Sequence, residues 1–356
     1  MIVHGLDLSY FTGKLEGYLR LKGLAYRFEP MDTAAFMTLG DRVGVRQMPH
    51  LTLHDGRLLT DTVVIIDALE SQDSGSGCAS LTPDDRTTAF VAHLVEAFAD
   101  EHLWRPALYY RWAFDDDARQ ASRRLAETLL RDVRAPVGLK QVYILQRQRW
   151  LYLRGEGSGR KQARVVQADY LALLDALEPV FRERDWLLGD APTRADVGLF
   201  GPLFRHFLCD PTPGRIMRER APATAAWAMR LWASEARRPP CARGMVLSTA
   251  GLAPLIGLFT DHFLPEAAAN AQACAEGRRM ASWARGGVTF RYRANPYRAW
   301  RLHRLSEQYA TLPTRDQNRV RRLLGSAACE LLSLAQTWPM ASQDQHRTRD
   351  RWWRRA

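Results

Sequence analysis

The chain has 356 residues, of which 46% are hydrophobic and 25% are charged, a balance typical of a globular protein rather than a disordered or fibrous one. Its net charge of +11 comes almost wholly from arginine, so nucleic acid or an acidic surface has to be considered as a partner. No apolar run reaches the roughly 20 residues of a membrane span, and the first residues lack a secretory signal, so we expect a cytoplasmic protein.

The first 30 residues predict a strand, a helix and a second strand. Ile2 and Val3 start an extended segment, and helical spacing begins at Thr12. Residues 26–28 return as a strand. Residues 31–46 show no regular spacing, and we expect an irregular connection there.

Residues 47–69 are the most informative stretch of the sequence. Pro49 precedes a short strand, Asp55 and Gly56 predict a tight hairpin turn, and a second short strand follows. Asp61 and Thr62 then open an apolar helix, because their side-chain oxygens can accept hydrogen bonds from the unpaired amides of a helix start. The same amides and the helix dipole favour an anion at this position.

A Gly/Ser-rich stretch at residues 71–80 predicts a linker, and strand signals are sparse after it. Thr193 and Asp196 have the spacing of a capping box, with a hydroxyl at a helix start and a carboxylate three residues later. The segments with helical spacing are residues 87–102, 115–131, 162–181 and 195–207.

Residues 104–150 interleave aromatic side chains with arginine. This pattern can bind nucleic acid, but it also suits a packed helical hairpin, which we favour. Further on, residues 237–240 predict a connector, residues 245–259 a bent buried helix, and residues 288–292 a short strand. A basic tail with two tryptophans occupies residues 347–355.

The five cysteines are scattered along the chain without a CxxC pair. This arrangement argues against a disulfide framework and against a structural zinc site. His206 and Cys209 are three residues apart, but no second ligand pair accompanies them, and we expect no metal.

Four motifs, in this order, resemble those of the soluble glutathione transferases. Residues 9–12 (SYFT) precede a helix where thioredoxin-like proteins carry CxxC and where the transferases carry a catalytic Ser, Cys or Tyr. Residues 47–49 (QMP) resemble the cis-proline motif, residues 61–62 (DT) the motif that holds the γ-glutamyl group, and residues 193–196 the folding motif of the helical domain. The likeness covers residues 1–235, and the chain is also similar to a bacterial subgroup with a long C-terminal extension.

The resemblance implies an α/β thioredoxin-like N-terminal domain followed by an all-α, glutathione-transferase-like C-terminal domain with a helical extension. We place the glutathione-binding domain at residues 1–75, a linker at 76–86, the all-helical domain at 87–235 and the extension at 236–356. A cytoplasmic homodimer is also implied by the resemblance.

The resemblance further implies glutathione as co-substrate. Ser9 would polarise the glutathione thiol, with Tyr10 as its competitor and Thr12 as a third choice. Either hydroxyl could stabilise the thiolate, which is the reactive form of a thiol. The absence of cysteine at this position points away from reductase chemistry.

The other predicted site residues bind the rest of the tripeptide. Met48 and Pro49 would pair with its cysteinyl backbone, and Asp61 and Thr62 would hold its γ-glutamyl end. A small, apolar electrophile would lie between the domains, against one or more of the residues His102, Trp104, Tyr109 and Tyr110.

Three functions are consistent with this sequence. The first is a glutathione transferase-like enzyme. The second is a non-catalytic module that binds a protein partner through its C-terminal extension, because residues 236–356 exceed what a minimal transferase needs. The third, nucleic-acid binding, rests on charge alone and ranks last.

Overall fold

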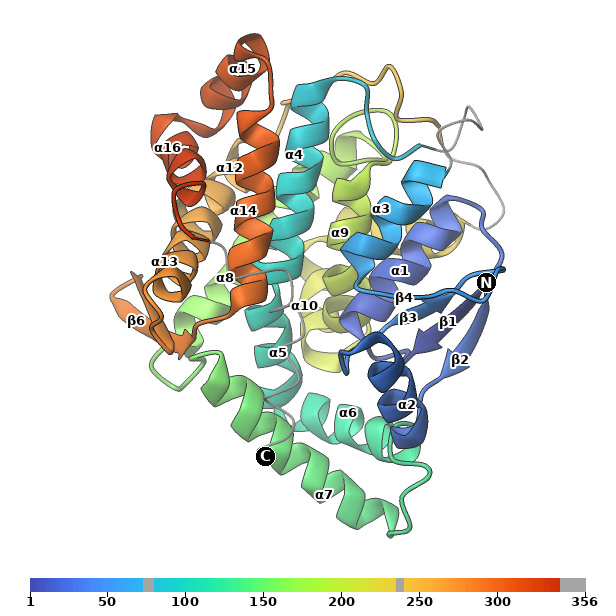
Figure 1. Ribbon diagram of the computed structural model, residues 1–356. Helices are drawn as coiled ribbons and strands as arrows, with labels where there is room; N and C mark the ends of the chain where they lie inside the picture. The colour runs from blue at the N-terminus through green and yellow to red at the C-terminus, as the bar shows by residue number, and fades with distance from the viewer. Residues whose placement is uncertain (73–79, 235–239, 340–356) are drawn as a thin grey trace.

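The computed structural model describes residues 1–72, 80–234 and 240–339 (Figure 1). Residues 73–79 of the Gly/Ser-rich stretch, the first residues of the predicted connector and the basic tail lie outside these ranges. No helix in the described part of the chain is long and apolar enough to cross a membrane.

A small four-stranded sheet forms the N-terminal domain. It consists of β1 (Ile2–Gly5), β2 (Arg27–Pro30), β3 (His50–Thr52) and β4 (Leu58–Thr60), in the order β2-β1-β3-β4. β1 runs parallel to β2 and antiparallel to β3, which is antiparallel to β4. The predicted strands and the hairpin turn are therefore confirmed, and Gly56 adopts a φ of 83° in that turn.

Three helices accompany this sheet, and one of them was not predicted. Helices α1 (Tyr10–Leu21) and α3 (Thr62–Gln72) lie between the sheet and the second domain (Figure 1). The expectation of an irregular connection at residues 31–46 is wrong, because α2 (Thr33–Val43) forms there. Asp32 caps its start by accepting a hydrogen bond from the Ala35 amide, and Gly44 ends it with a φ of 76°.

The second domain is helical, as the sequence predicts. Helix α4, the π-helical turn η1 and helix α5 follow one another along the chain, and we call them the central rod of this domain. The predicted capping box of Thr193 and Asp196 is present at the start of α9. The elements are α4 (Arg86–Ala97), η1 (Phe98–His102), α5 (Trp104–Ala113), α6 (Asp115–Glu127), α7 (Val137–Gln148), η2 (Arg149–Arg154), α8 (Ala163–Glu183), α9 (Arg194–Pro202), η3 (Leu203–Leu208), α10 (Pro211–Arg220) and α11 (Pro222–Trp232).

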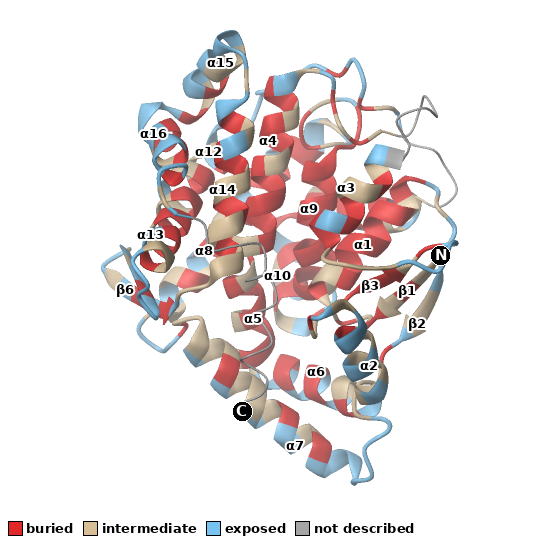
Figure 2. Ribbon diagram, viewed as in Figure 1, coloured by how far each residue is buried: buried red, intermediate tan, exposed pale blue. Residues whose placement is uncertain are grey.

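Glycines allow close helix contacts between the two domains and within the second domain. Gly17 on α1 faces Phe200 of α9, and a Cβ at position 17 would lie 2.4 Å from that ring. Gly198 on α9 faces α4, and a Cβ there would lie 2.7 Å from the Cα of Glu96. Figure 2 shows α4 and α9 buried along much of their length. The packing of α1 on α9 fixes the helix that carries the predicted thiol-activating hydroxyl.

The extension folds against the central rod of the second domain. The expected helix at residues 245–259 is wrong in its first half, since Gly251 has a φ of 70° and the helix starts only at Ala253. The expected strand at 288–292 lies in β6, paired with β5, which was not predicted. The elements are α12 (Ala253–Gly257), η5 (Leu258–Phe263), α13 (Leu264–Ala275), β5 (Met280–Arg285), β6 (Val288–Arg293), α14 (Pro296–Ala310), α15 (Thr314–Leu324) and α16 (Ser326–Ala335).

Arginines on one face of α14 join the extension to the rest of the molecule. Arg301 pairs with Asp100 of η1 at 3.1 Å, and Arg304 pairs with Asp67 of α3 at 2.8 Å. Helix α14 therefore contacts both the helical domain and the N-terminal domain.

Candidate functional site

The strand register brings the three predicted glutathione motifs to one end of the sheet. His4 of β1 lies opposite His50 of β3, and His50 lies opposite Thr60 of β4. This row of residues crosses the sheet where β1 and β4 end and where β3 begins. The segments that follow β1, precede β3 and follow β4 therefore meet at this end, and they contain Ser9, Pro49 and Asp61, respectively.

Ser9 caps α1, but its hydroxyl keeps a donor function. The side chain is half-buried, and its Oγ accepts a hydrogen bond from the Thr12 amide at 3.3 Å. A serine hydroxyl has one proton to donate in addition to its acceptor lone pairs. Within the described residues no acceptor for that proton is found, so the cap and a bond to a ligand are compatible.

Tyr10 and Thr12 are placed differently from Ser9. Tyr10 is 1% exposed, and its hydroxyl donates to the carbonyl of Ala99 in the helical domain. Burial, with Asp100 nearby, raises the pKa of Tyr10 well above its ordinary value, so this hydroxyl stays protonated and bound to Ala99. Thr12 is fully buried beneath Gly5. The geometry therefore favours Ser9 among the three hydroxyls.

The Met48–Pro49 peptide bond is cis, as expected from the resemblance. Thr60 holds this segment, because its hydroxyl donates to the Pro49 carbonyl at 3.2 Å and accepts from the side-chain amide of Gln47 at 3.1 Å. Met48 is half-buried, and its backbone N–H and C=O have no hydrogen-bond partner in the part of the chain that is described. An extended peptide could pair with these two groups as an added strand.

Asp61 and Thr62 form the start of α3 with an unusual backbone. Asp61 has a φ of 72°, a conformation that is rare outside glycine and that clusters at functional sites. Its carboxylate accepts the Val63 amide at 3.0 Å, so one of the free amides of the helix start is already satisfied. The Thr62 hydroxyl has no hydrogen-bond partner among the described residues, although the residue is only 4% exposed.

The helical domain fixes the loop that carries Ser9. Arg111 is 5% exposed, and one of its amino groups donates to the Leu8 carbonyl at 2.7 Å. The same guanidinium donates twice to the Asp210 carboxylate, at 2.8 and 2.9 Å. The backbone before Ser9 is thus anchored on a buried, bidentate ion pair.

Aromatic side chains from both domains gather beside the start of α1. Phe11 stacks on Trp104 with ring centroids 5.7 Å apart, and Tyr152 meets Trp104 edge-on at 5.9 Å. Phe11 and Tyr152 were not predicted. The adjacency of Phe11 to the hydroxyl motif could have identified it, whereas no local signal marks Tyr152.

The other residues expected beside the electrophile lie elsewhere. Tyr110 is 2% exposed in the helical core, and His102 is buried with a hydrogen bond to Glu266 at 3.0 Å. Tyr109 accepts a hydrogen bond from Gln167 at 3.3 Å. Trp104 is therefore the residue of the four that lies against Phe11.

A second polar cluster lies between the helical domain and the extension. Ligand atoms of His102, Asp169 and His262 lie within 4.8 Å of one another, a set that could hold a metal. Arg285 donates to both Asp169 and His262. Its positive charge neutralises the carboxylate, so an ion pair joins the cluster in this structure.

Comparison with known proteins identifies relatives. Models of the glutathione S-transferase N-terminal and C-terminal domains match residues 3–77 and 142–235, respectively. The isoprene-epoxide–glutathione S-transferase of Rhodococcus sp. (strain AD45) is 26% identical over 208 residues, which are 58% of this chain and 82% of that relative.

Two solved structures illustrate the structural likeness. The β-etherase LigF of Sphingobium sp. strain SYK-6 has a TM-score of 0.45 and 18% identity, over 65% of this chain and 93% of its own. A glutathione S-transferase from Rhodospirillum rubrum F11 has a TM-score of 0.41 and 19% identity, over 72% of this chain and 91% of its own.

Proposed function

Because the chain belongs to the soluble glutathione transferase family, we propose that it activates the glutathione thiol for attack on an apolar electrophile. The observation that carries the proposal is the meeting of three motifs at one sheet end. These motifs are Ser9 at the start of α1, the Met48–Pro49 peptide before β3, and Asp61 and Thr62 at the start of α3.

Ser9 is the proposed thiol-activating residue. A free thiol has a pKa of about 8.5 and is mostly protonated at neutral pH. A hydrogen bond from Ser9, with the positive end of the α1 dipole, would stabilise the thiolate. Lowering the thiol pKa by two units requires about 2.7 kcal/mol of preferential stabilisation, which a charge-assisted hydrogen bond can largely supply.

The remaining motifs are proposed to hold the tripeptide. The unpaired backbone groups of Met48 would pair with its cysteinyl residue. The Asp61 carboxylate would bind the γ-glutamyl ammonium, while the Thr62 hydroxyl and the helix start would bind the γ-glutamyl carboxylate. Each assignment matches a ligand group of opposite charge or complementary hydrogen-bonding capacity.

The electrophile is proposed to lie against Phe11, Trp104 and Tyr152. These half-buried rings offer an apolar wall beside Ser9, which suits a small hydrophobic molecule. Since the relative from Rhodococcus is named for an isoprene epoxide, we choose a small alkene epoxide as the first substrate to assay.

The test compares Ser9→Ala with Tyr10→Phe, which removes the neighbouring hydroxyl. Both variants and the wild type are titrated with glutathione, and the pKa of the bound thiol is followed by thiolate absorbance. We expect Ser9→Ala to bind glutathione with little change, to raise the thiol pKa by about one to two units, and to lose about tenfold to hundredfold in kcat/KM at pH 7. The pKa should be unchanged in Tyr10→Phe.

Two results would contradict the proposal at different levels. Absence of glutathione binding at millimolar concentration, or binding unaffected by Asp61→Ala, would refute the glutathione site. A thiol pKa that shifts in Tyr10→Phe and not in Ser9→Ala would refute only the choice of Ser9. A folded protein without binding or turnover would favour the alternative, a non-catalytic module that binds a protein partner.

The assembly is a further part of the proposal. The family resemblance suggests a homodimer, which light scattering coupled to size-exclusion chromatography would test.

A further inference from the structure

Two histidines and a carboxylate converge where the extension packs on the helical domain. They are His102 at the end of η1, Asp169 on α8 and His262 in η5, and their ligand atoms lie within 4.8 Å of one another. Both histidines lie in π-helical turns, which are rare and occur frequently at functional sites. The proposed contacts to glutathione use none of these three side chains.

Hydrogen bonds orient His102 in the way that metal ligands are usually oriented. Its Nδ1 lies 3.0 Å from the Glu266 carboxylate and donates to it, and Arg105 holds that carboxylate by an ion pair. A metal-binding histidine almost always donates its other ring N–H to a carboxylate, a carbonyl or water. With the proton on Nδ1, the lone pair of Nε2 is free, and this nitrogen lies 4.0 Å from a carboxylate oxygen of Asp169.

His262 also presents a lone pair to the cluster. Arg285 bonds to its Nδ1, and since arginine has donors only, that nitrogen has to accept. The same nitrogen lies 3.4 Å from a carboxylate oxygen of Asp169. Neighbouring ligand atoms around a tetrahedral Zn²⁺ are about 3.4 Å apart, given metal–ligand distances of about 2.1 Å. The separations of 3.4 and 4.0 Å in the cluster are therefore close to those of a metal site.

The cluster already binds a cation, which is the guanidinium of Arg285. This side chain donates to both Asp169 and His262 from the last residue of β5. The chain turns directly after it, at two glycines with positive φ, so Arg285 lies at the tip of the β5–β6 hairpin. A long side chain at a hairpin tip can move into solvent. The His262 side chain is 22% exposed, which leaves a path for an incoming ion.

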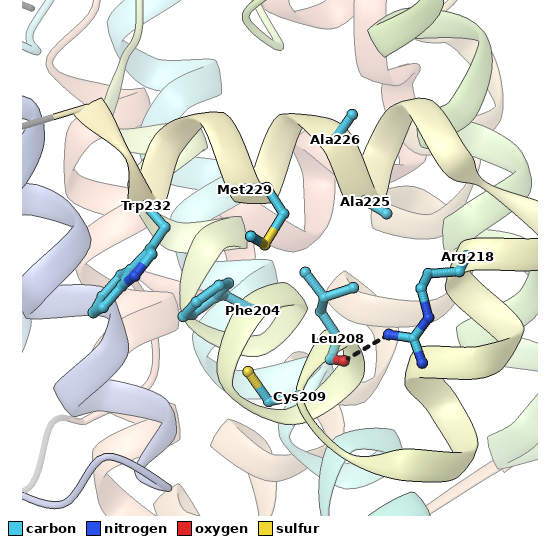
Figure 3. Close-up of a pocket in the computed structure, with 8 residues that line it drawn as sticks. All are labelled: Phe204, Leu208, Cys209, Arg218, Ala225, Ala226, Met229 and Trp232. Atoms are coloured by element: carbon cyan, nitrogen blue, oxygen red, sulfur yellow. Dashed lines mark hydrogen bonds between the residues drawn. The ribbon is translucent and has the colours of Figure 1, made fainter.

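The pair His206 and Cys209, three residues apart in the sequence, is arranged differently. Both ring nitrogens of His206 are engaged, one with Arg111 at 2.9 Å and the other with the Ala107 carbonyl at 3.4 Å. Cys209 lines an apolar groove together with Phe204 (Figure 3). Its exposed thiol could still bind a metal on its own, so Cys209 enters the test as a control.

We propose that His102, Asp169 and His262 bind a Zn²⁺ ion in exchange for the guanidinium of Arg285. Imidazole and carboxylate groups are zinc ligands, and three protein ligands leave a fourth position for water. The ion would connect η1 and α8 of the helical domain to η5 of the extension. Because an ion that binds only the folded state stabilises it, zinc would hold the extension in place. The proposal does not depend on glutathione binding.

The test titrates ZnCl₂ into chelator-treated full-length protein by calorimetry and compares unfolding midpoints with and without zinc. We expect one ion per chain, bound in the micromolar range or more tightly, and a higher midpoint in zinc. His262→Gln, which can still accept from Arg285, should weaken binding about hundredfold or more because a ligand is lost. Arg285→Gln should strengthen binding about tenfold, because no cation has to be displaced.

His303→Gln and Cys209→Ser are the controls. The side chain of His303 is 18% exposed, similar to that of His262, but it pairs with Glu307 on α14. Both substitutions should leave the zinc affinity unchanged, and loss of binding in either would place the ion elsewhere and overturn the proposal. So would an affinity that does not fall in His262→Gln, an affinity that does not rise in Arg285→Gln, or the absence of zinc binding at millimolar concentration.

Discussion

Substitution of Gly198 by alanine tests the close contact between α9 and α4. A Cβ at this position would lie 2.7 Å from the Cα of Glu96 and 3.2 Å from its Cβ. Real Cβ atoms essentially never approach other heavy atoms within 3.0 Å, so one helix backbone has to move. Unlike the end of a flexible side chain, the nearest atom cannot rotate away.

The expected change in the free energy of unfolding of Gly198→Ala is the difference between two opposing effects. Alanine improves helix propensity over glycine by about 1 kcal/mol. Overpacking a well-packed interface costs typically 1 to 3 kcal/mol, and the upper value applies because the clash involves backbone. We therefore expect Gly198→Ala to lower the free energy of unfolding by about 2 kcal/mol.

Gly138→Ala is the matched control on α7. No heavy atom lies within 4 Å of a Cβ built at that position, so only the propensity gain should remain, about 0.5 kcal/mol because Gly138 is in the first turn of the helix. Urea unfolding followed by tryptophan fluorescence measures both variants. Opposite shifts of the unfolding midpoint, without a change in its urea dependence, are expected. A Gly198→Ala protein as stable as Gly138→Ala would refute the close contact.

Burial raises the pKa of Asp196 to about 6, so its contribution to stability is complete below pH 4 and is lost as the pH rises through 6. Asp196→Asn should therefore show a smaller fall in unfolding free energy between pH 4 and pH 7, and an unchanged profile would contradict this. A double-mutant cycle of Arg304→Ala and Asp67→Asn should give a coupling of about 0.5 to 1 kcal/mol that decreases in 1 M salt, since both side chains are partly exposed. Asp132 accepts the Thr33 and Ala34 amides at the start of α2, so Asp132→Ala should cost about 1 kcal/mol in urea unfolding and Asp132→Asn much less.

The elements that the sequence predicted well carry strong local signals. The hairpin follows from Asp55 and Gly56, and the start of α9 follows from its capping box. Helix α2 was missed although Phe36, Leu39 and Val43 have helical spacing; these side chains are only partly buried, and Gly40 is its one buried residue. Its caps and the Asp132 carboxylate from the second domain stabilise it. Asp132 lies 98 residues after Ala34 in the sequence, so the sequence around α2 does not reveal this contact.

The candidate site could be predicted only in part for the same reason. Local motifs identify Ser9, Pro49 and Asp61 as candidates, and the strand register then places them at one end of the sheet. The choice between Ser9 and Tyr10 depends on Ala99, which accepts the Tyr10 hydroxyl from 89 residues away. The aromatic wall likewise depends on Tyr152 of η2, which lies 48 residues after Trp104 and which no local signal marks.

The net charge of +11 raised a nucleic acid or an acidic surface as a partner, but part of this charge is paired inside the protein. Several arginines are at least nine-tenths buried and pair with carboxylates, so their charge is not presented to a nucleic acid; they are Arg105, Arg111, Arg194, Arg298 and Arg301. Removing one partner of a buried ion pair costs about 3 to 5 kcal/mol, because the other charge stays buried without compensation.

This cost determines how the role of the extension should be tested. Deletion of the extension would remove Arg301 and leave the buried Asp100 without one of its two cations, Lys14 being the other. Such a truncation destabilises the helical domain, so a lost partner in a pull-down would not distinguish a binding surface from unfolding. Substitutions of exposed residues on α15 and α16, away from the arginine face of α14, separate the two effects.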